Sequence, residues 1–189
     1  MPYLETPRIR LEDFTPADAH LLKDLDSDPE VMLYLNGGRP STDEEVDSAL
    51  LRILALKDKY KGRFGLWKAF EKESNAFVGW FLFRPDKKDP DNMKSIELGY
   101  RLRKEFWNKG FATEVSTILM KNGFNELGVE IVWARTHFAN TKSQNVMKKI
   151  GLKFERHYEE VEFEGADKRG IIYSISKDQW IEGKIVTTV

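Results

Sequence analysis

Apolar and polar residues alternate with a period of two in several short runs of this chain, which is the pattern of strands that bury one face. Most of these runs are rich in aromatic or β-branched residues. The runs that predict strands are residues 8–14, 63–72, 76–84, 95–102, 129–137, 152–164 and 168–180. The short polar connections ESN, at 73–75, and GAD, at 165–167, predict two hairpins.

Other segments carry helix-capping residues followed by apolar residues three or four positions apart. Thr15 before Pro16 and Asp28 before Pro29 are typical helix starts. Ser41 with Glu44 three residues later predicts a capping box. The helix behind it would place one apolar face inward, formed by Val46, Ala49, Leu50, Ile53 and Leu54.

Two further helices each follow a predicted strand. The first begins near Gly110 and ends at Gly128, and the second is capped by Asn140 and ends at Gly151. The order β-α-α-α-β-β-β-α-β-α-β-β combines hairpins with strand–helix–strand units. It therefore predicts an α/β (α+β) fold with a mixed central sheet flanked by helices, and not a regular doubly wound fold. We expect the whole chain, 1–189, to form a single domain.

Composition narrows the class of protein. The 189 residues are 41% apolar and 32% charged with a net charge of −1, which argues against a general nucleic-acid-binding surface. Cysteine is absent, which excludes thiol catalysis and disulfides and is compatible with a reducing cytosol. No apolar run approaches the roughly 20 residues of a membrane span. A cytoplasmic protein without a membrane or nucleic-acid partner is expected.

The stretch RKEFWNKGFATE, residues 103–114, joins the strand at 95–102 to the next helix. A helix start presents unpaired N–H groups and the positive end of the helix dipole, which suit an anion. Gly110 can adopt a positive φ and lets a ligand approach the backbone, while Arg103, Lys104 and Lys109 add positive charge. The same residues also fit a plain turn with solvated lysines, so this stretch alone leaves both interpretations open.

A second polar helix start, ANTKSQNVMKKIG at 139–151, follows the strand at 129–137. Asn140 can cap this helix, and Ser143 lies in its first turn. A capped surface helix is the alternative interpretation. Because both helix starts follow the carboxyl ends of strands, where open α/β sheets bind ligands, the pair favours a binding site.

The segments IELGYRLRKEFWNKGFATE, residues 96–114, and ARTHFANTKSQNVMKKIGLKFE, residues 134–155, together resemble the acetyl-CoA core of the GCN5-related N-acetyltransferases (GNAT superfamily). They look closest to the RimJ/RimL-like branch, which acetylates ribosomal-protein N-termini, and the resemblance extends over nearly the whole chain. It implies a mostly antiparallel sheet in which the strand at 95–102 splays from the strand at 129–137.

The resemblance also implies acetyl-CoA as cosubstrate and no metal. The pantetheine arm would lie between the splayed strands, with the pyrophosphate on the backbone amides of residues 108–113. The general pattern of the family has Gln or Arg where this chain has Trp107, although the branch commonly has Trp there. The residues expected to bind acetyl-CoA are Leu102, Arg103, Trp107, Asn108, Lys109, Gly110, Phe111, Ala112, Thr113, Asn140 and Ser143.

The mechanism implied by the family is direct attack of a neutral amine on the thioester in a ternary complex. The departing thiolate needs a proton donor, and many relatives place a tyrosine on the helix after Asn140. This chain has no tyrosine between 140 and 151, so the resemblance implies Ser143 as the donor, positioned by Asn140. Glu97 is expected to be the general base. An ion pair with Lys or Arg on a neighbouring strand is the alternative role for Glu97.

Other candidates for proton transfer are Glu160 and Glu162 and, more weakly, His137 at the end of a strand. The three histidines, His20, His137 and His157, have no metal-ligand spacing. The acceptor would be a primary amine, either a protein N-terminus or a small molecule. A homodimer, and a non-catalytic acyl-CoA-binding module of the same fold, remain alternatives.

Acceptor specificity is expected to come from residues 15–60 and from the hairpin at 155–170, whose acidic EEVEFEGAD could attract a cationic amine or simply be solvated. Four aromatic residues could line an acceptor pocket or belong to the core: Tyr34, Trp67, Trp80 and Phe81. Because Trp80 and Phe81 are adjacent on a strand, they would face opposite sides of the sheet.

Overall fold

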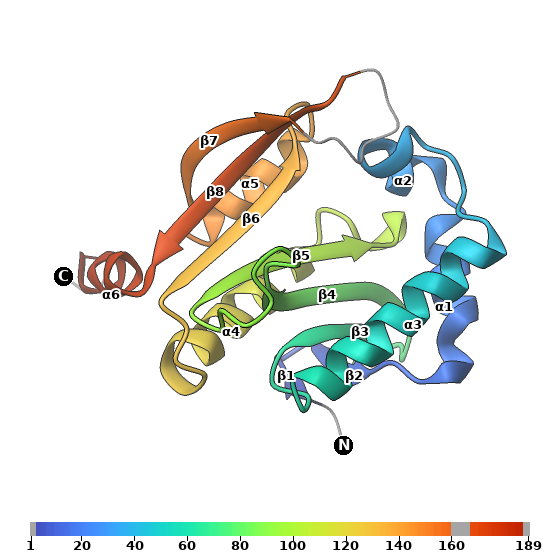
Figure 1. Ribbon diagram of the computed structural model, residues 1–189, viewed down its shortest axis with the longest axis horizontal. Helices are drawn as coiled ribbons and strands as arrows, with labels where there is room; N and C mark the ends of the chain where they lie inside the picture. The colour runs from blue at the N-terminus through green and yellow to red at the C-terminus, as the bar shows by residue number, and fades with distance from the viewer. Residues whose placement is uncertain (1–2, 160–166, 187–189) are drawn as a thin grey trace.

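The computed structural model describes residues 3–159 and 167–186, and side chains as far as residue 183. Within these residues the chain forms one eight-stranded sheet in the order β1-β2-β3-β4-β5-β6-β8-β7 (Figure 1). The strands are β1 (Leu4–Glu5), β2 (Ile9–Asp13), β3 (Gly65–Glu71), β4 (Phe77–Pro85), β5 (Ser95–Leu102), β6 (Ile131–His137), β7 (Lys153–Glu159) and β8 (Arg169–Ser176). All neighbours pair antiparallel except β5 and β6. The predicted fold class is confirmed.

The central feature of the sheet is the divergence of β5 and β6. These strands pair in parallel only between Ser95–Glu97 and Ile131–Trp133. Beyond that point β5 stays paired with β4 as far as Leu102, whereas β6 stays paired with β8 as far as His137. The carboxyl halves of β5 and β6 are therefore not bonded to each other, which confirms the predicted splay.

Helices cover both faces of the sheet. In the view of Figure 1, α3 (Asp43–Lys59) lies in front of the sheet, and α4 (Phe111–Glu126) and α5 (Thr141–Lys149) lie behind it. Two shorter helices, α1 (Ala19–Asp26) and α2 (Pro29–Asn36), precede α3, and α1 packs against it. Helix α4 packs against β4, β5 and α5. The helix starts that follow β5 and β6 are thus on one face.

The core has one cluster on each face, which follows from the alternation along β4. Phe81 and Phe83 belong to the larger cluster with α4, while Trp80 packs against the cluster formed with α1 and α3. Trp80 and Phe81 do face opposite sides, as predicted. Trp67 and Phe81 are at most 1% exposed, so both belong to the core and neither lines an acceptor pocket.

A buried ion pair connects the first helical segment to the sheet. Asp18, at the end of the short 3-10 helix Pro16–Asp18, accepts a hydrogen bond of 2.7 Å from the Lys68 ammonium of β3. The backbone and hydroxyl of Thr15 also donate to the Asp18 carboxylate, each at 2.7 Å. Burial acts to raise the pKa of Asp18, but the hydrogen bonds from Lys68 and Thr15 outweigh it and hold that pKa below its ordinary value.

Two predictions of helix starts were wrong in detail. The capping box of α3 is formed by Thr42 and Glu45, one residue later than predicted. Ser41 instead donates its hydroxyl to Asp26, at 3.0 Å. The last strand ends at Ser176, and residues 177–180 begin helix α6 (Lys177–Val186). Ser176 and Gln179 exchange side chain-to-backbone hydrogen bonds there, a capping box that the letters SKDQ contain.

The turn of the last hairpin and the acids Glu160 and Glu162 lie outside the described residues. The helix predicted to begin at Pro16, with Thr15 as its N-cap, opens with the 3-10 helix Pro16–Asp18. Strand β1 and the 3-10 helix Lys104–Phe106 were not predicted. Each is too short to show a period in the sequence.

Candidate functional site

The chain enters α4 through a start whose backbone donors are unpaired. After β5 it makes the 3-10 helix Lys104–Phe106, and then Asn108 and Gly110 both adopt positive φ, 60° and 82°. Gly110 is the N-cap of α4 and supplies no side-chain cap. Among the described residues, no acceptor contacts the N–H groups of residues 111–113. Free donors at the positive end of a 16-residue helix form a favourable anion site.

Arg8 fixes this helix start from the N-terminal part of the sheet. Its guanidinium donates to the Lys109 carbonyl at 3.0 Å and to the Glu114 carboxylate at 2.7 Å, and it stacks 4.5 Å from the Phe111 ring. Burial acts to raise the pKa of Glu114, but hydrogen bonds from Thr6 and Arg8 outweigh it and lower that pKa. The only acidic residue in the first turn is therefore held in an ion pair.

Trp107 connects the two predicted halves of the site. Its indole N–H donates to the carbonyl of Leu102, the last residue of β5, at 2.8 Å. The ammonium of Lys142, in the first turn of α5, lies 4.5 Å from the centroid of the Trp107 ring. This cation–π contact joins the segment before α4 to the start of α5, and no local pattern in the sequence predicts it.

The cationic side chains near the start of α4 differ in whether they form ion pairs with acidic residues. Arg103 pairs with Asp24 at 3.2 Å and with Glu105 at 3.0 Å, and its backbone N–H donates to Val78. Lys104 pairs with Glu30 of α2. These two residues, expected to add charge to an anion site, are engaged by acids instead. Lys109 contacts the Phe106 ring at 5.0 Å, and no ion pair involves it or Lys142 within the described part of the chain.

The start of α5 joins Asn140, Ser143 and a residue that the sequence did not indicate. The Asn140 side chain accepts the Ser143 backbone N–H at 3.1 Å, so Asn140 caps the helix as predicted. The Tyr100 hydroxyl, from the half of β5 that is no longer paired with β6, lies 3.5 Å from the Ser143 Oγ. Burial raises the pKa of Tyr100, and the contact with Ser143 opposes that shift. Strand alternation predicts that Tyr100 and Glu97 point to opposite faces of the sheet, but it does not predict the contact between Tyr100 and Ser143.

Glu97 lies at the base of the splay, where it pairs in register with Trp133. One carboxylate oxygen contacts Arg84 of β4 at 2.8 Å and the other contacts Arg135 of β6 at 2.9 Å. The Glu97 side chain is only 7% exposed. The structure thus shows the alternative role, an ion pair with neighbouring strands. A role for Glu97 as general base stays a prediction, and both of its oxygens already contact cations.

His137 is also engaged. Its Nδ1 accepts the Ala139 N–H at 3.1 Å, so Nε2 carries the proton and donates to the Asp167 carbonyl at 2.8 Å. Its ring stacks on Tyr34 of α2, with 5.4 Å between centroids. Both ring nitrogens have partners, which favours a structural role for this histidine and for Tyr34.

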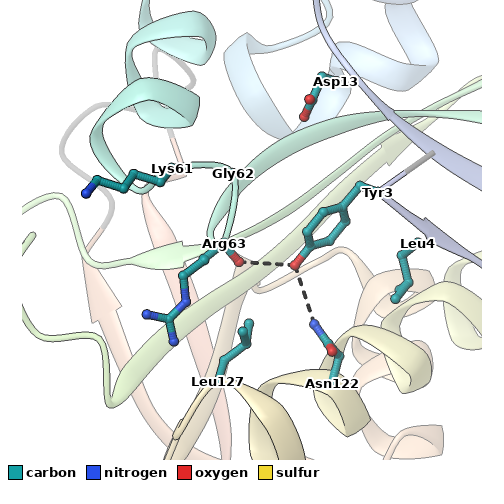
Figure 2. Close-up of a pocket in the computed structure, with 8 residues that line it drawn as sticks. All are labelled: Tyr3, Leu4, Asp13, Lys61, Gly62, Arg63, Asn122 and Leu127. Carbon is teal, nitrogen blue, oxygen red and sulfur yellow. Dashed lines mark hydrogen bonds between the residues drawn. The ribbon is translucent and has the colours of Figure 1, made fainter. Parts of the chain in front are cut away.

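A pocket of about 470 Å³ lies elsewhere, near the C-terminal end of α4 (Figure 2). Figure 2 shows Tyr3 between Arg63 and Asn122: the phenol donates to the Arg63 carbonyl at 3.1 Å and accepts from Asn122 at 3.4 Å. Burial raises the pKa of Tyr3 to about 12. Because Asn122 is three helical turns from Gly110, this pocket is separate from the anion site.

Neither a metal cluster nor a membrane helix is found in the part of the chain that the structure describes. No group of three or more His, Asp or Glu side chains there could hold a metal ion. No helix there is both long enough and apolar enough to cross a membrane.

The β5–β6 pair diverges beyond Glu97 and Trp133, and a helix start with free or capped backbone donors follows each strand. The family model of the acetyltransferase (GNAT) domain matches residues 8–153. The chain therefore belongs to the GNAT acetyltransferase family, as its sequence predicted, and is an acetyltransferase.

Individual relatives agree with this assignment. The chain is 29% identical over 187 residues to the FsC-acetyl coenzyme A-N(2)-transacetylase of Aspergillus fumigatus, covering 95% of this chain and 78% of the relative. It is 31% identical over 163 residues to the uncharacterized N-acetyltransferase p20 of Bacillus licheniformis, covering 84% and 88%.

Solved structures share the fold. A GNAT-family acetyltransferase from Bacillus anthracis superposes with a TM-score of 0.76 at 23% identity, covering 93% of this chain and 98% of the other. RimL, a ribosomal alpha-N-protein acetyltransferase in complex with coenzyme A, superposes with a TM-score of 0.78 at 17% identity, covering 95% and 99%. RimL belongs to the branch that the sequence resembles.

Proposed function

We propose that the protein transfers the acetyl group of acetyl-CoA to a primary amine, with both substrates bound in one ternary complex. The observation that carries this proposal is the start of α4, where Gly110 adopts a φ of 82° and the next three N–H groups have no acceptor among the described residues. This start lies directly beyond the end of β5, at the open side of the splay. A phosphate at such a site is stabilised by N–H donors and by the helix dipole.

The cofactor-binding residues follow from this placement. The backbone of residues 108–113 would hold the pyrophosphate, and the diverging halves of β5 and β6 would bond the pantetheine arm with their free backbone groups. Lys109 and Lys142 would add the positive charges, because Arg103 and Lys104 are engaged by acids. Trp107 would support the site by fixing the backbone, because its indole N–H binds the carbonyl of Leu102 at the open side of the gap between β5 and β6.

The chemistry is attack of an amine nitrogen on the thioester carbonyl, which forms the C–N bond, breaks the C–S bond and moves a proton from nitrogen to sulfur. Ser143 would donate to the sulfur, and Asn140 would hold Ser143 through its backbone N–H. Glu97 was expected to take the amine proton. Its contacts with Arg84 and Arg135 favour loss of that proton to water instead, with Glu97 holding the strands.

The acceptor would be the amine of a small molecule or of a protein N-terminus. Among the similar proteins, one is named for transfer to FsC, and another for a ribosomal protein. The acceptor would approach from the face that carries α1 and α2, where Arg101 of β5 is paired with Asp26.

Binding of acetyl-CoA is tested with Gly110→Glu. A Cβ at Gly110 would meet only the tip of Arg8, at 3.5 Å, so there is space for the side chain, whose carboxylate would repel the pyrophosphate. The φ of 82° strains any side chain there, so the control must carry the same strain. Gly128→Glu is the matched control, because Gly128 has a φ of 74° and open space at the other end of the same helix. By calorimetric titration, we expect Gly110→Glu to weaken acetyl-CoA binding at least tenfold and Gly128→Glu to leave it unchanged.

Turnover is tested by release of free CoA thiol with a panel of peptides, polyamines and aminoglycosides. Release that depends on one class of amine supports the proposal and identifies the acceptor. Tight binding of acetyl-CoA with no amine-dependent release from any class would point to the non-catalytic alternative. Equal affinity of the Gly110→Glu and Gly128→Glu variants would contradict the assignment of the phosphate site.

A further inference from the structure

We propose that Tyr100 is a positioning residue that aims the hydroxyl of Ser143 at the departing sulfur. The inference rests on the proposed function, in which Ser143 donates to that sulfur. It adds a residue on β5 to a site otherwise built from the starts of α4 and α5. Tyr100 lies on the half of β5 that has left β6, so its side chain borders the gap between the strands.

The hydroxyl of Ser143 donates to no protein group in the described part of the chain. Its backbone N–H is taken by Asn140 at 3.1 Å, which fixes the backbone and leaves the hydroxyl free to rotate. The Ser143 Oγ faces the Tyr100 hydroxyl at 3.5 Å and donates to no other group among the described residues. By contrast Thr117, on α4, donates its hydroxyl to the carbonyl four residues earlier, at 2.8 Å. The Ser143 hydrogen is therefore available to a ligand.

Tyr100 is the donor in its contact with Ser143. Burial raises the pKa of Tyr100, so its phenol keeps its proton and serves as a donor at neutral pH. When Ser143 Oγ accepts this hydrogen, its own O–H must point away from Tyr100. A distance of 3.5 Å is long for such a bond, and contacts of this kind tighten when the substrate completes the site.

The packing of Tyr100 makes it a suitable fixed donor. Its ring lies 5.9 Å from the Phe81 ring of the neighbouring strand β4, and Phe81 is fully buried. A rigid phenol held by the core loses little freedom when it bonds Ser143. During transfer, the electron pair of the broken C–S bond stays on sulfur, and the chain from Tyr100 through Ser143 stabilises that charge. Ser143 gives its proton to sulfur, and the proton that nitrogen loses to water replaces it.

Tyr100→Phe removes one oxygen and tests the inference. We expect kcat for CoA release to fall about tenfold, while the Kd for acetyl-CoA stays within about twofold, because the bond matters only as sulfur becomes charged. Tyr173→Phe is the matched control: Tyr173 donates to Gln144 of the same helix at a similar 3.4 Å, but does not touch Ser143. We expect Tyr173→Phe to keep the wild-type kcat.

A double-variant cycle separates positioning from simple structural support. If Tyr100 acts through Ser143, the Tyr100→Phe/Ser143→Ala enzyme should turn over no more slowly than Ser143→Ala alone. A wild-type kcat in Tyr100→Phe, or losses that multiply in the double variant, would overturn the inference and leave the proposed function intact. No transfer by the wild-type enzyme to any amine would overturn the proposed function, and this inference with it.

Discussion

Replacing Glu97 with Gln tests whether this residue holds the strands together or takes a proton. The carboxylate contacts Arg84 at 2.8 Å and Arg135 at 2.9 Å, and so connects β4, β5 and β6 at the point where β5 and β6 begin to separate. The glutamine is nearly isosteric but neutral. It would remove the negative charge that lies between the two guanidinium groups.

The cost follows from the burial of the three side chains. Glu97 is 7% exposed, Arg84 is 13% exposed and Arg135 is 28% exposed. Removing one partner of a buried ion pair costs about 3–5 kcal/mol, and the partial exposure of Arg135 favours the lower end, about 3 kcal/mol. At roughly 2–4 °C for each kcal/mol in a chain of this size, the Tm should fall by roughly 6–12 °C.

The assay is thermal unfolding followed by circular dichroism, with Glu130→Gln as the control. Glu130 pairs with Lys94 at 2.7 Å, but these side chains are 59% and 70% exposed, so the control should leave the Tm close to that of the wild type. Residual kcat is measured at 25 °C, where the variant is folded. A Tm like that of the control, together with a loss of kcat of about 100-fold or more, would refute the structural role and favour the general base.

Two further variants test other contacts. Asp18→Asn should lower the unfolding free energy by about 3 kcal/mol at pH 7. The folded pKa of Asp18 is depressed, so this stabilisation is present above the unfolded value of about 4 and is lost as the pH falls. Urea unfolding between pH 3 and 7 should show the difference from wild type shrinking; a constant difference would contradict this account. Trp107→Phe keeps a ring for Lys142 but loses the 2.8 Å bond to Leu102, about 1 kcal/mol. Titration should show the acetyl-CoA Kd rising up to about fivefold, and an unchanged Kd would count against Trp107 as a support of the loop.

Much of the fold could be predicted because its strands are long enough to show alternation and its helices carry caps. The errors occur where the local signals compete. Ser41 and Thr42 both suit an N-cap, and only Asp26, on another helix, draws Ser41 away from that role. The run from 168 continues to alternate through Ser176, so the cap formed with Gln179 was hidden within an apparent strand.

The candidate site likewise contains features that the local sequence predicts and contacts that it does not. Asn140 as cap and Gly110 at the start of α4 follow from local chemistry, and the structure places both at those helix ends. The partners of Arg103 and Lys104 do not, because Asp24 and Glu30 lie more than 70 residues earlier in the chain. The contact between Tyr100 and Ser143 likewise spans 43 residues. Pairings over such distances depend on the tertiary fold, and no local pattern encodes them.

Strand β5 carries side chains toward both faces of the sheet, which would let it border both substrates of the proposed reaction. Successive residues of β5 point to opposite faces, so Glu97 and Arg101 face the side of α1 and α2, while Tyr100 faces the side of α4 and α5. The contact of Glu97 with Arg135 connects β5 and β6 where they begin to separate. At the open side of the gap, Lys142 packs on the Trp107 ring. Because both ends are fixed by contacts within the protein, we expect the gap to exist before acetyl-CoA binds. An amine that approaches from the α1–α2 face would then meet the thioester carbonyl in the gap between β5 and β6, with the sulfur toward Ser143.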